Sequence, residues 1–328
     1  MATTKGDAQM RRLTAISAAI AMAFGVSTLA LAGDDNFALT FQNGNGNTAT
    51  VDQTGADNAN RLLQFGGPQG GVLPGFLLNH DTVHQVGDHN TASVTQGGNG
   101  SDDITAQVNQ QGNFNSATIN STGTGVSHGG APGPGTWAYI TTVGNNSTAT
   151  ISQVSSGNSA AAYISQGFKT NTSNNNVGTI SQIGTSGEFN HNNFTALPGG
   201  GGGFIWNDTN IAQDGTGNQA TILQQGSSNS SADVIQIGNG NTGSISQFNV
   251  SNNSLASIEQ YGASNFASSI ASGDADSSIV QNGSFNTATT SQVFTVGSPN
   301  VAAIFQTGNL NVAGVTQQGG GNRVTIRQ

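Results

Sequence analysis

The chain of 328 residues contains no cysteine, few charged residues and few aromatic ones. The absence of cysteine excludes disulfides and thiolate metal sites. Charged residues make up 7% of the chain, whereas about 25% is usual for a soluble domain. Large apolar side chains are also scarce, so a thick apolar core is not expected. The few basic residues form no patch that could neutralise phosphates, which argues against nucleic acid as a partner.

What the chain does contain is glycine, at 48 residues, together with an excess of Asn, Gln, Ser and Thr. Disorder is one interpretation of so polar a composition. Disordered chains of low hydropathy usually carry a high net charge, however, and here charges of both signs are rare. An uncharged composition rich in Asn and Gln is closer to that of chains that associate through β-structure.

The N-terminus has the pattern of a signal peptide. Lys5, Arg11 and Arg12 precede an apolar stretch over 13–31, and the sequence ALA ends at Ala32. This pattern predicts a signal peptide over 1–32, cut after Ala32, and therefore an exported protein. A membrane anchor is the alternative, but polar residues interrupt the stretch and no second charged flank follows it. No later apolar run is long enough to span a bilayer, so we expect no membrane insertion after cleavage.

The rest of the chain is built from a short repeat. Its clearest form is Asn-x-Ala-x-(Ile/Val)-x-Gln-x-Gly, and the commonest distance between closing glutamines is eleven residues. About 22 such units can be aligned, with Ser121, Thr142 and Ala271 in the glutamine position of degenerate units. The step of two within each unit predicts a β-strand with Asn, Ala, Ile or Val and Gln on one face. Gly and Asn at the unit boundaries favour tight turns.

The shared face is predicted to point inward and to form an amide and aliphatic ladder. Its predicted members are Gln42, Asn47, Val51, Gln53, Gln64, Gln85, Asn90, Val94, Gln96, Gln110, Gln153, Gln182, Gln213, Asn218, Ile222, Gln224, Gln236, Asn241, Ile245, Gln247, Ile258, Gln260, Gln281, Gln292, Asn300, Ile304, Gln306, Asn311, Val315, Gln317 and Gln328.

Stacking explains why amides would be buried. A buried amide without partners is costly, but in a stack each amide donates to one neighbour and accepts from the other. Stacked charges would repel each other instead. We therefore predict an all-β solenoid of about eleven turns, each of two strands and about 22 residues. It forms a single domain over 33–328, with loop insertions near 66–75, 122–135 and 183–204. A degenerate strand is conceivable at 190–196, within the last insertion.

At this point the pattern resembles the curlin repeat of curli, the bacterial functional amyloids. Residues 213–224 read QDGTGNQATILQ, and the same order of Gln, Gly, Asn, Ala and Gln recurs over nearly the whole mature chain. The resemblance implies a homopolymer of a curli-like fibre, which serves the biofilm matrix and adhesion. It also implies secretion by a Gram-negative bacterium through a dedicated outer-membrane pore with chaperones, and a nucleator subunit as a partner. This chain is longer than usual curlins and carries insertions, and the roles of major subunit, nucleator and accessory member all stay open.

Patterns of catalytic or metal-binding chemistry are weak by comparison. The glycines at 238, 240 and 243 match a dinucleotide fingerprint, but another strand unit follows them instead of a helix. Residues 97–102 resemble one copy of a calcium-binding nonapeptide, a motif that works in tandem. The five histidines show no ligand spacing. We expect no cofactor and no enzymatic activity.

Two other functions remain as alternatives. The chain could be a monomeric secreted solenoid that acts as an adhesin or a carbohydrate-binding β-helix protein. Outward Thr pairs such as Thr48 and Thr50 could also bind ice, although solvated strand positions explain them more simply. The acidic pairs at 102–103 and at Asp274 and Asp276 are interpreted as solvated turn charges that discourage premature association.

Overall fold

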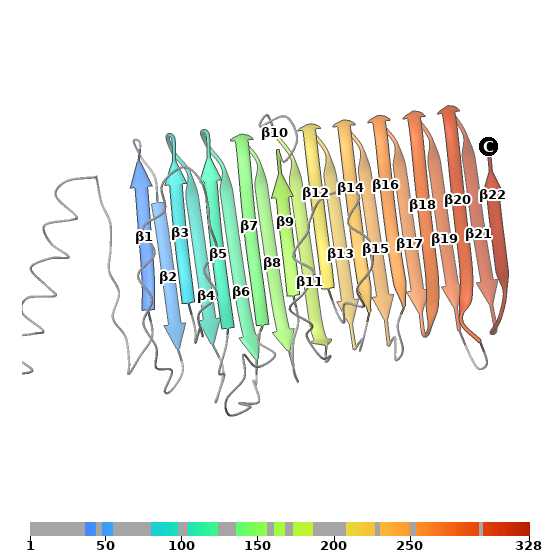
Figure 1. Ribbon diagram of the computed structural model, residues 1–328, viewed down its shortest axis with the longest axis horizontal. Helices are drawn as coiled ribbons and strands as arrows, with labels where there is room; N and C mark the ends of the chain where they lie inside the picture. The colour runs from blue at the N-terminus through green and yellow to red at the C-terminus, as the bar shows by residue number, and fades with distance from the viewer. Residues whose placement is uncertain are drawn as a thin grey trace, which may run out of the picture.

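The computed structural model describes residues 37–43, 48–54, 80–97, 104–123, 136–155, 161–167, 173–185, 208–226, 230–249, 254–294 and 298–328. Every regular element in these ranges is a β-strand, and none of the ranges contains a helix that could cross a bilayer. The strands form two sheets in which all neighbours run parallel, and the sheets face each other along the whole stack (Figure 1).

In these described ranges, sheet A has twelve strands and sheet B has ten. The strands of sheet A are β1 (Phe37–Asn43), β3 (His80–Val86), β5 (Ile104–Gln111), β7 (Thr136–Asn145), β9 (Ala161–Gln166), β10 (Ser173–Asn174), β12 (Asp208–Thr216), β14 (Ser231–Asn239), β16 (Leu255–Ala263), β18 (Ala275–Ser284), β20 (Asn300–Asn309) and β22 (Arg323–Arg327). The strands of sheet B are β2 (Thr48–Thr54), β4 (Thr91–Gly97), β6 (Ser116–Gly123), β8 (Thr148–Ser155), β11 (Val177–Thr185), β13 (Gln219–Gln225), β15 (Thr242–Phe248), β17 (Phe266–Ser272), β19 (Thr287–Val293) and β21 (Val312–Gln318).

The chain alternates between the two sheets, so it coils with one strand of each sheet per turn. This arrangement is a β-solenoid, and the predicted fold class is confirmed. The predicted number of turns differs slightly. Among the described residues, the ten strands of sheet B give ten complete turns and β22 adds half a turn, against about eleven expected. The difference arises because β9 and β10 share one position in sheet A, where both pair with β7 and β12. The possible strand at 190–196 lies outside the described residues.

Equivalent positions of the repeat stack directly on one another. Between β18 and β20, Ile279 pairs with Ile304 and Gln281 with Gln306, and the same holds for every neighbouring pair with the repeat pattern. A slip by one residue would turn every inward side chain to solvent, so the alternation itself fixes this register.

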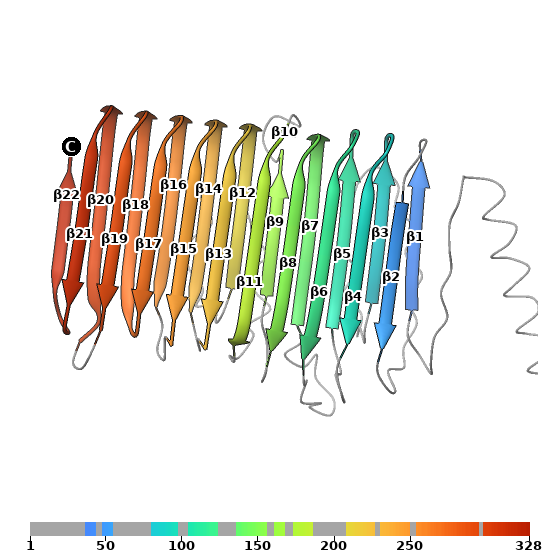
Figure 2. The ribbon, with the colours of Figure 1, turned by 180° about the vertical axis from the view of Figure 1, so that it is seen from behind.

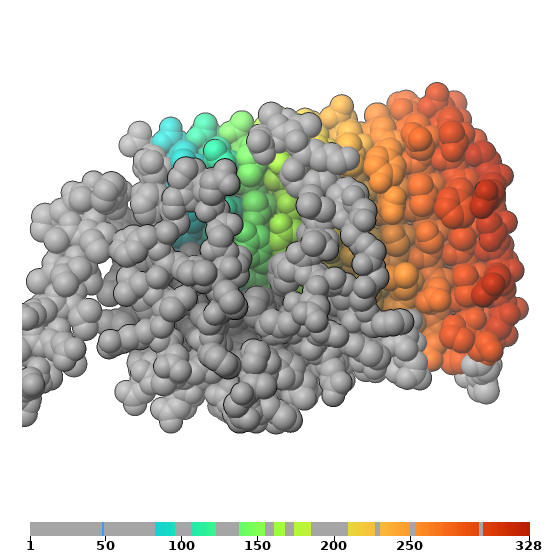
Figure 3. Space-filling model, viewed as in Figure 1, coloured from blue at the N-terminus to red at the C-terminus, as the bar shows by residue number. Residues whose placement is uncertain are grey.

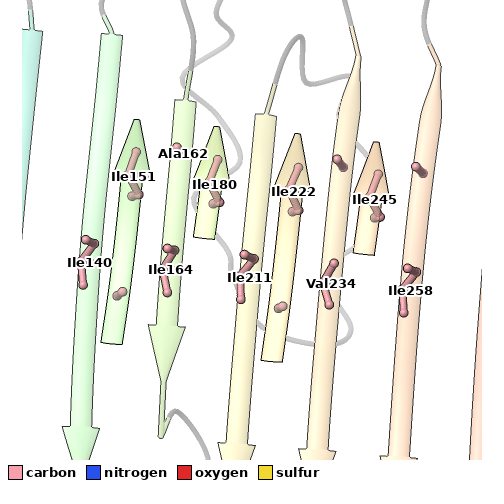
Figure 4. Packing of buried hydrophobic residues seen from close by; sticks show 14 of the residues in the cluster. Ile140, Ile151, Ala162, Ile164, Ile180, Ile211, Ile222, Val234, Ile245 and Ile258 are labelled. Atoms are coloured by element: carbon pink, nitrogen blue, oxygen red, sulfur yellow. The ribbon is translucent and has the colours of Figure 1, made fainter. Parts of the chain in front are cut away.

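The core is a thin layer of aliphatic side chains between the sheets. One Ile or Val from nearly every strand lies there with no exposed surface, for example Ile211 and Val234 of sheet A and Ile222 and Ile245 of sheet B. Figure 4 shows these side chains facing one another across the layer. Each contributes about 1.5–3 kcal/mol on burial. The neighbouring position is usually Ala, because the sheets approach closely there: a Cβ on Gly243 would lie 2.8 Å from Cγ1 of Val234.

The corners that lead from sheet A to sheet B are short and uniform, and we call them the tight edge. In the described part of the chain this edge comprises 87–90, 112–115, 144–147, 173–176, 215–218, 238–241, 262–265, 283–286 and 308–311, at the top of Figure 1. Most of these corners begin with a glycine of positive φ, such as Gly238 at 123°. A Cβ there would lie 1.9 Å from the carbonyl oxygen of Gly262, so only glycine allows the corners to stack this closely.

At the opposite edge, the lower one in Figures 1 and 2, the chain leads from sheet B back to sheet A. The three predicted insertions fall in the sequence between a strand of sheet B and the next strand of sheet A, and most of their residues lie outside the described ones. The strands β6 and β11 continue to Gly123 and Thr185, slightly further than predicted. One connection, 168–172, joins β9 to β10 within sheet A. The predicted signal peptide over 1–32 lies outside the described residues. Towards the C-terminus the outer side chains form a continuous, nearly flat face (Figure 3).

Candidate functional site: the stacked amide rows

Glutamines at one inward position of sheet A form a continuous hydrogen-bonded row over its second half. Nε2 of Gln213 donates to Oε1 of Gln236 at 2.8 Å, and Nε2 of Gln236 donates to Oε1 of Gln260 at 2.8 Å. The row continues through Gln281 and Gln306 to Gln328 with distances of 2.9, 2.9 and 3.1 Å. Each buried amide therefore accepts from one neighbour and donates to the next, in a single direction along the stack.

The same Nε2 atoms also donate across the core. Gln236 contacts the backbone carbonyl of Gln219 at 2.8 Å, and Gln281 contacts that of Phe266 at 2.9 Å. Both acceptors lie at the start of a sheet B strand. The two protons of each carboxamide are thus used, one along the stack and one across it. Each glutamine of this row therefore holds its own turn closed and joins it to the next turn.

Sheet B carries an equivalent row, which is interrupted. Gln153, Gln182, Gln224 and Gln247 are linked by Nε2 to Oε1 hydrogen bonds of 2.9, 3.1 and 2.8 Å. Ala271 occupies the next position, and the row resumes with Gln292 donating to Gln317 at 2.8 Å.

Asparagines at the end of most tight corners form a further row, in which Ser147 replaces asparagine at the corner 144–147. Oδ1 of Asn241 accepts from the backbone nitrogen of Asn265 at 3.1 Å, and Nδ2 of Asn241 donates to the carbonyl of Gly262 at 3.0 Å. The same pair of contacts recurs along the edge at Asn90, Asn115, Asn218 and Asn265. The asparagine side chain therefore satisfies backbone groups that the turn leaves without strand partners.

Interrupted rows leave buried polar atoms without hydrogen bonds. Thr142 is too short to reach Gln110, and Nε2 of Gln110 has no partner among the described residues. Ala271 offers no donor, and Oε1 of Gln292 has no partner among them either. These exceptions indicate that a buried amide avoids the cost of unmade hydrogen bonds only where the neighbouring turns continue the row.

The inward rows are uncharged, and the perturbed titratable groups lie on the outward faces of the strands. Burial raises the pKa of Asp276, an effect opposed by its hydrogen bond from the backbone nitrogen of Leu255 and reinforced by the charge of Asp274. Burial also raises the pKa of Tyr163, whose ring stacks on Tyr139 at 5.0 Å. A side-chain hydrogen bond of Tyr163 with Ser165 opposes this rise in its pKa.

The described residues include no group of three side chains that could hold a metal ion. His84 contacts Oδ1 of Asn109 at 3.2 Å, and His89 stacks on Phe114. The glycines of the dinucleotide-like pattern are divided between a tight corner, at 238 and 240, and the interior of β15, at 243. What the rows can do chemically is to present hydrogen-bonding groups to a further strand of the same kind.

Of the predicted ladder residues, those with described side chains are buried, except that Asn311 is half-buried and Gln328 is exposed in the last turn. Gln42 and Gln53 lie in register with Gln85 and Gln96, and only the backbone is described at Gln42, Val51, Gln53 and Gln96. Asn47 and Gln64 lie outside the described residues.

The predicted set omitted several members of the asparagine row, namely Asn115, Asn176, Asn265 and Asn286. A signal for them was present in the sequence, because a buried asparagine follows the sheet A glutamine after five residues, as Asn115 follows Gln110. The corner glycines were predicted as turn formers, but the close approach of their carbonyls to the next turn was not foreseen.

Comparison with known protein families identifies the repeat. The model of the curlin associated repeat matches residues 33–66, 207–231, 228–262 and 297–328. These matches include β1 and β2 at one end of the stack, β12 to β15 in the middle, and β20 to β22 at the other end. No curated protein matches the chain. Four matches to this model lie on a solenoid of stacked amide rows, so this chain carries the curlin associated repeat.

Proposed function

We propose that the chain is a structural subunit of a curli-like extracellular fibre, in which copies join end to end by strand addition. One observation carries the proposal: the same strand register repeats along the whole stack, from β1 and β2 to β21 and β22. A stack with a constant register offers the same surface at its end as between its turns. A second copy can therefore continue both sheets.

The C-terminal end of the stack supports this proposal. Among the described residues, β22 and β21 each have a neighbour on one side only. The inward side chains Val324 and Ile326 pack against the core but are partly exposed, whereas Ile304 one turn earlier is fully buried. Gln328 accepts a hydrogen bond from Gln306 and is itself exposed. A further strand pair would cover these apolar groups and extend both amide rows.

Export fits the same function. The predicted signal peptide over 1–32 would deliver the mature chain to the periplasm. By analogy with the family, passage through a dedicated outer-membrane pore and contact with a nucleator subunit would follow, and the fibre would serve biofilm formation and adhesion. An acidic solenoid with an uncharged core needs no cofactor for such a role.

The test is assembly of the mature chain, residues 33–328, together with two variants of β22. The unchanged chain should form fibres that bind amyloid dyes and diffract at about 4.7–4.8 Å. Ile326→Lys places an ammonium group on the inward face of the end strand, where strand addition would bury it without a partner. Because such burial costs several kcal/mol, elongation should slow by at least about tenfold.

Thr325→Lys is the matched control, because Thr325 is the exposed neighbour on the same strand and its side chain stays outside the stack. It should assemble at nearly the rate of the unchanged chain. A mature chain that stays monomeric at high concentration would overturn the proposal and favour a monomeric adhesin or carbohydrate-binding protein. Equal elongation rates for the two lysine variants would overturn end-to-end addition at β22.

A further inference from the structure

The tight edge carries one row of residues in the left-handed backbone region. Among the described corners, the row consists of His89, Phe114, Asn146, Asn175, Gly217, Gly240, Ser264, Phe285 and Leu310, with φ between 55° and 69°. Backbone hydrogen bonds hold the corners in register, since the amide of each of these residues from Phe114 onward donates to the corner before it, as Leu310 does to the carbonyl of Ser284 at 3.0 Å. These positions therefore follow one another in a line along the tight edge.

Three members of the row do not suit this backbone conformation. Gly and Asn adopt it readily, whereas Phe or Leu there costs roughly 1–2 kcal/mol. Phe114, Phe285 and Leu310 are nevertheless 58%, 60% and 73% exposed. Phe114 stacks on His89, but more than half of each of these three side chains remains in solvent, so the fold gains only part of their possible burial in return for the strain. Exposed apolar side chains held at a conformational cost indicate a contact with something outside the chain.

The bulky residues are placed symmetrically along the row. Counted outward from Gly217, the third residue is Phe114 in one direction and Phe285 in the other, and the fourth is His89 in one direction and Leu310 in the other. The positions between them hold only Asn, Ser and Gly. With about 4.8 Å per turn, each phenylalanine lies about 14 Å from Gly217 along the stack.

The tight edge also carries little charge, although the chain is acidic. The chain has a formal net charge of −9, yet Asp88 is the one carboxylate within the described tight corners. Beside the left-handed row lie amides such as Asn113, Asn239 and Asn309, whose Oδ1 atoms accept from backbone nitrogens of the preceding turn. Two copies can therefore approach along this edge with little repulsion and with polar groups at the rim of the contact.

We propose that two copies of the chain associate side by side along their tight edges, in antiparallel orientation. A two-fold axis at Gly217 brings Phe114 of each copy against Phe285 of the second copy, and His89 of each copy against Leu310. Such a contact is self-complementary, as two-fold interfaces require. The contact joins solenoids laterally, so it is separate from end-to-end strand addition.

A charge-swap series tests this contact by sedimentation velocity on freshly purified mature chain, before any fibre forms. Phe114→Lys alone and Phe285→Asp alone should each weaken dimerisation by about tenfold or more, as expected for loss of an aromatic anchor. The double variant should recover much of the lost dimer affinity. The ammonium introduced at position 114 would then face the carboxylate introduced at position 285 of the second copy, twice in each dimer. A parallel pairing would instead place like charges together in the double variant.

A second variant separates association from folding. Phe285→Asn should raise the stability of the monomer towards urea, since Asn fits the left-handed corner, and should still weaken dimerisation. Gln225→Lys, at an exposed position of β13 away from the edge, is the control and should change neither. Three results would each overturn the proposal. The unchanged chain could sediment as a monomer, the single variants could dimerise as strongly as the unchanged chain, or the double variant could dimerise no more strongly than the single variants. Dye binding by fibres of these variants reports on strand addition independently.

Discussion

At the scale of the residue, the interior of this protein is unusual because its polar side chains are as deeply buried as its aliphatic ones. Gln236 and Gln260 are fully buried, as Val234 and Ile258 are. An isolated buried carboxamide would be destabilising by about 1–3 kcal/mol for each unpaired group. Here the neighbouring turns supply both partners. The stability of any one glutamine is therefore a property of the row, and it depends on the residues one turn away on either side.

Ala271→Gln tests this dependence at the gap in the sheet B row. The new carboxamide would accept from Gln247 and donate to Oε1 of Gln292, which has no partner among the described residues. We expect an increase of about 1–2 kcal/mol in the free energy of unfolding, measured with urea before assembly. Ala267→Gln on the same strand is the control and should destabilise, because Ala267 is fully buried where the sheets approach closely. An unchanged or lowered stability of Ala271→Gln would contradict the account of the rows.

At the scale of the element, the strands were predictable and the corners were only partly so. The step of two assigns the inward face of β14 or β20 without reference to the rest of the molecule, because strand side chains alternate. Because the units repeat, each inward residue of one strand then pairs with the same residue type in the neighbouring strand. The sequence could not indicate that β9 and β10 divide one position, because an insertion and a degenerate unit look alike.

Corner conformation depends on contacts between turns, so it is not a local property of the sequence. Gly238 and Gly217 both have positive φ and both look like ordinary turn glycines. Gly238 faces the carbonyl of Gly262, whereas a Cβ on Gly217 would meet nothing within 4 Å. Two corner glycines therefore have different roles: one allows the turns to stack, and the other adopts a conformation that Asn146 and Asn175 also adopt.

Substitution at these two glycines should give very different results. Gly238→Ala should lower the free energy of unfolding by about 3 kcal/mol or more, because the methyl group meets the backbone of the next turn and the backbone conformation is strained. Gly217→Asn should change it by less than about 1 kcal/mol, since Asn tolerates this region. Urea denaturation of the two variants under one set of conditions measures both. Similar losses for both would mean that conformation alone, and not the contact with Gly262, makes Gly238 necessary.

At the scale of the whole molecule, the C-terminal end and the tight edge of the solenoid differ in character. The C-terminal end presents backbone groups and amide rows, whereas the tight edge presents a nearly uncharged line with apolar residues among its described corners. The inward rows are neutral, so the negative charge of the chain lies outside them. Repulsion between acidic copies thus opposes association more than it opposes folding.

Assembly should consequently depend on pH and salt. Lowering the pH from 7 towards the sequence pI of about 4.6 protonates carboxylates and should shorten the lag before dye-binding fibres appear. Asp276 contributes in the same direction, because its raised pKa lets it lose its charge at a higher pH than an ordinary aspartate. That raised pKa also means that the folded state binds this proton more tightly than the unfolded state. Its contribution to stability is therefore present at low pH and is lost as the pH rises through the raised value.

Salt provides the independent check at constant pH. At pH 7, raising the ionic strength from about 0.01 M to about 0.15 M shortens the Debye length from about 30 Å to about 8 Å, and assembly should accelerate without any change of protonation. The urea midpoint of the monomer should change little over the same range, because the hydrogen bonds of the rows are between neutral groups. If acid accelerates assembly and salt does not, protonation of particular groups such as Asp276 controls the step. If neither does, repulsion between copies does not limit fibre growth.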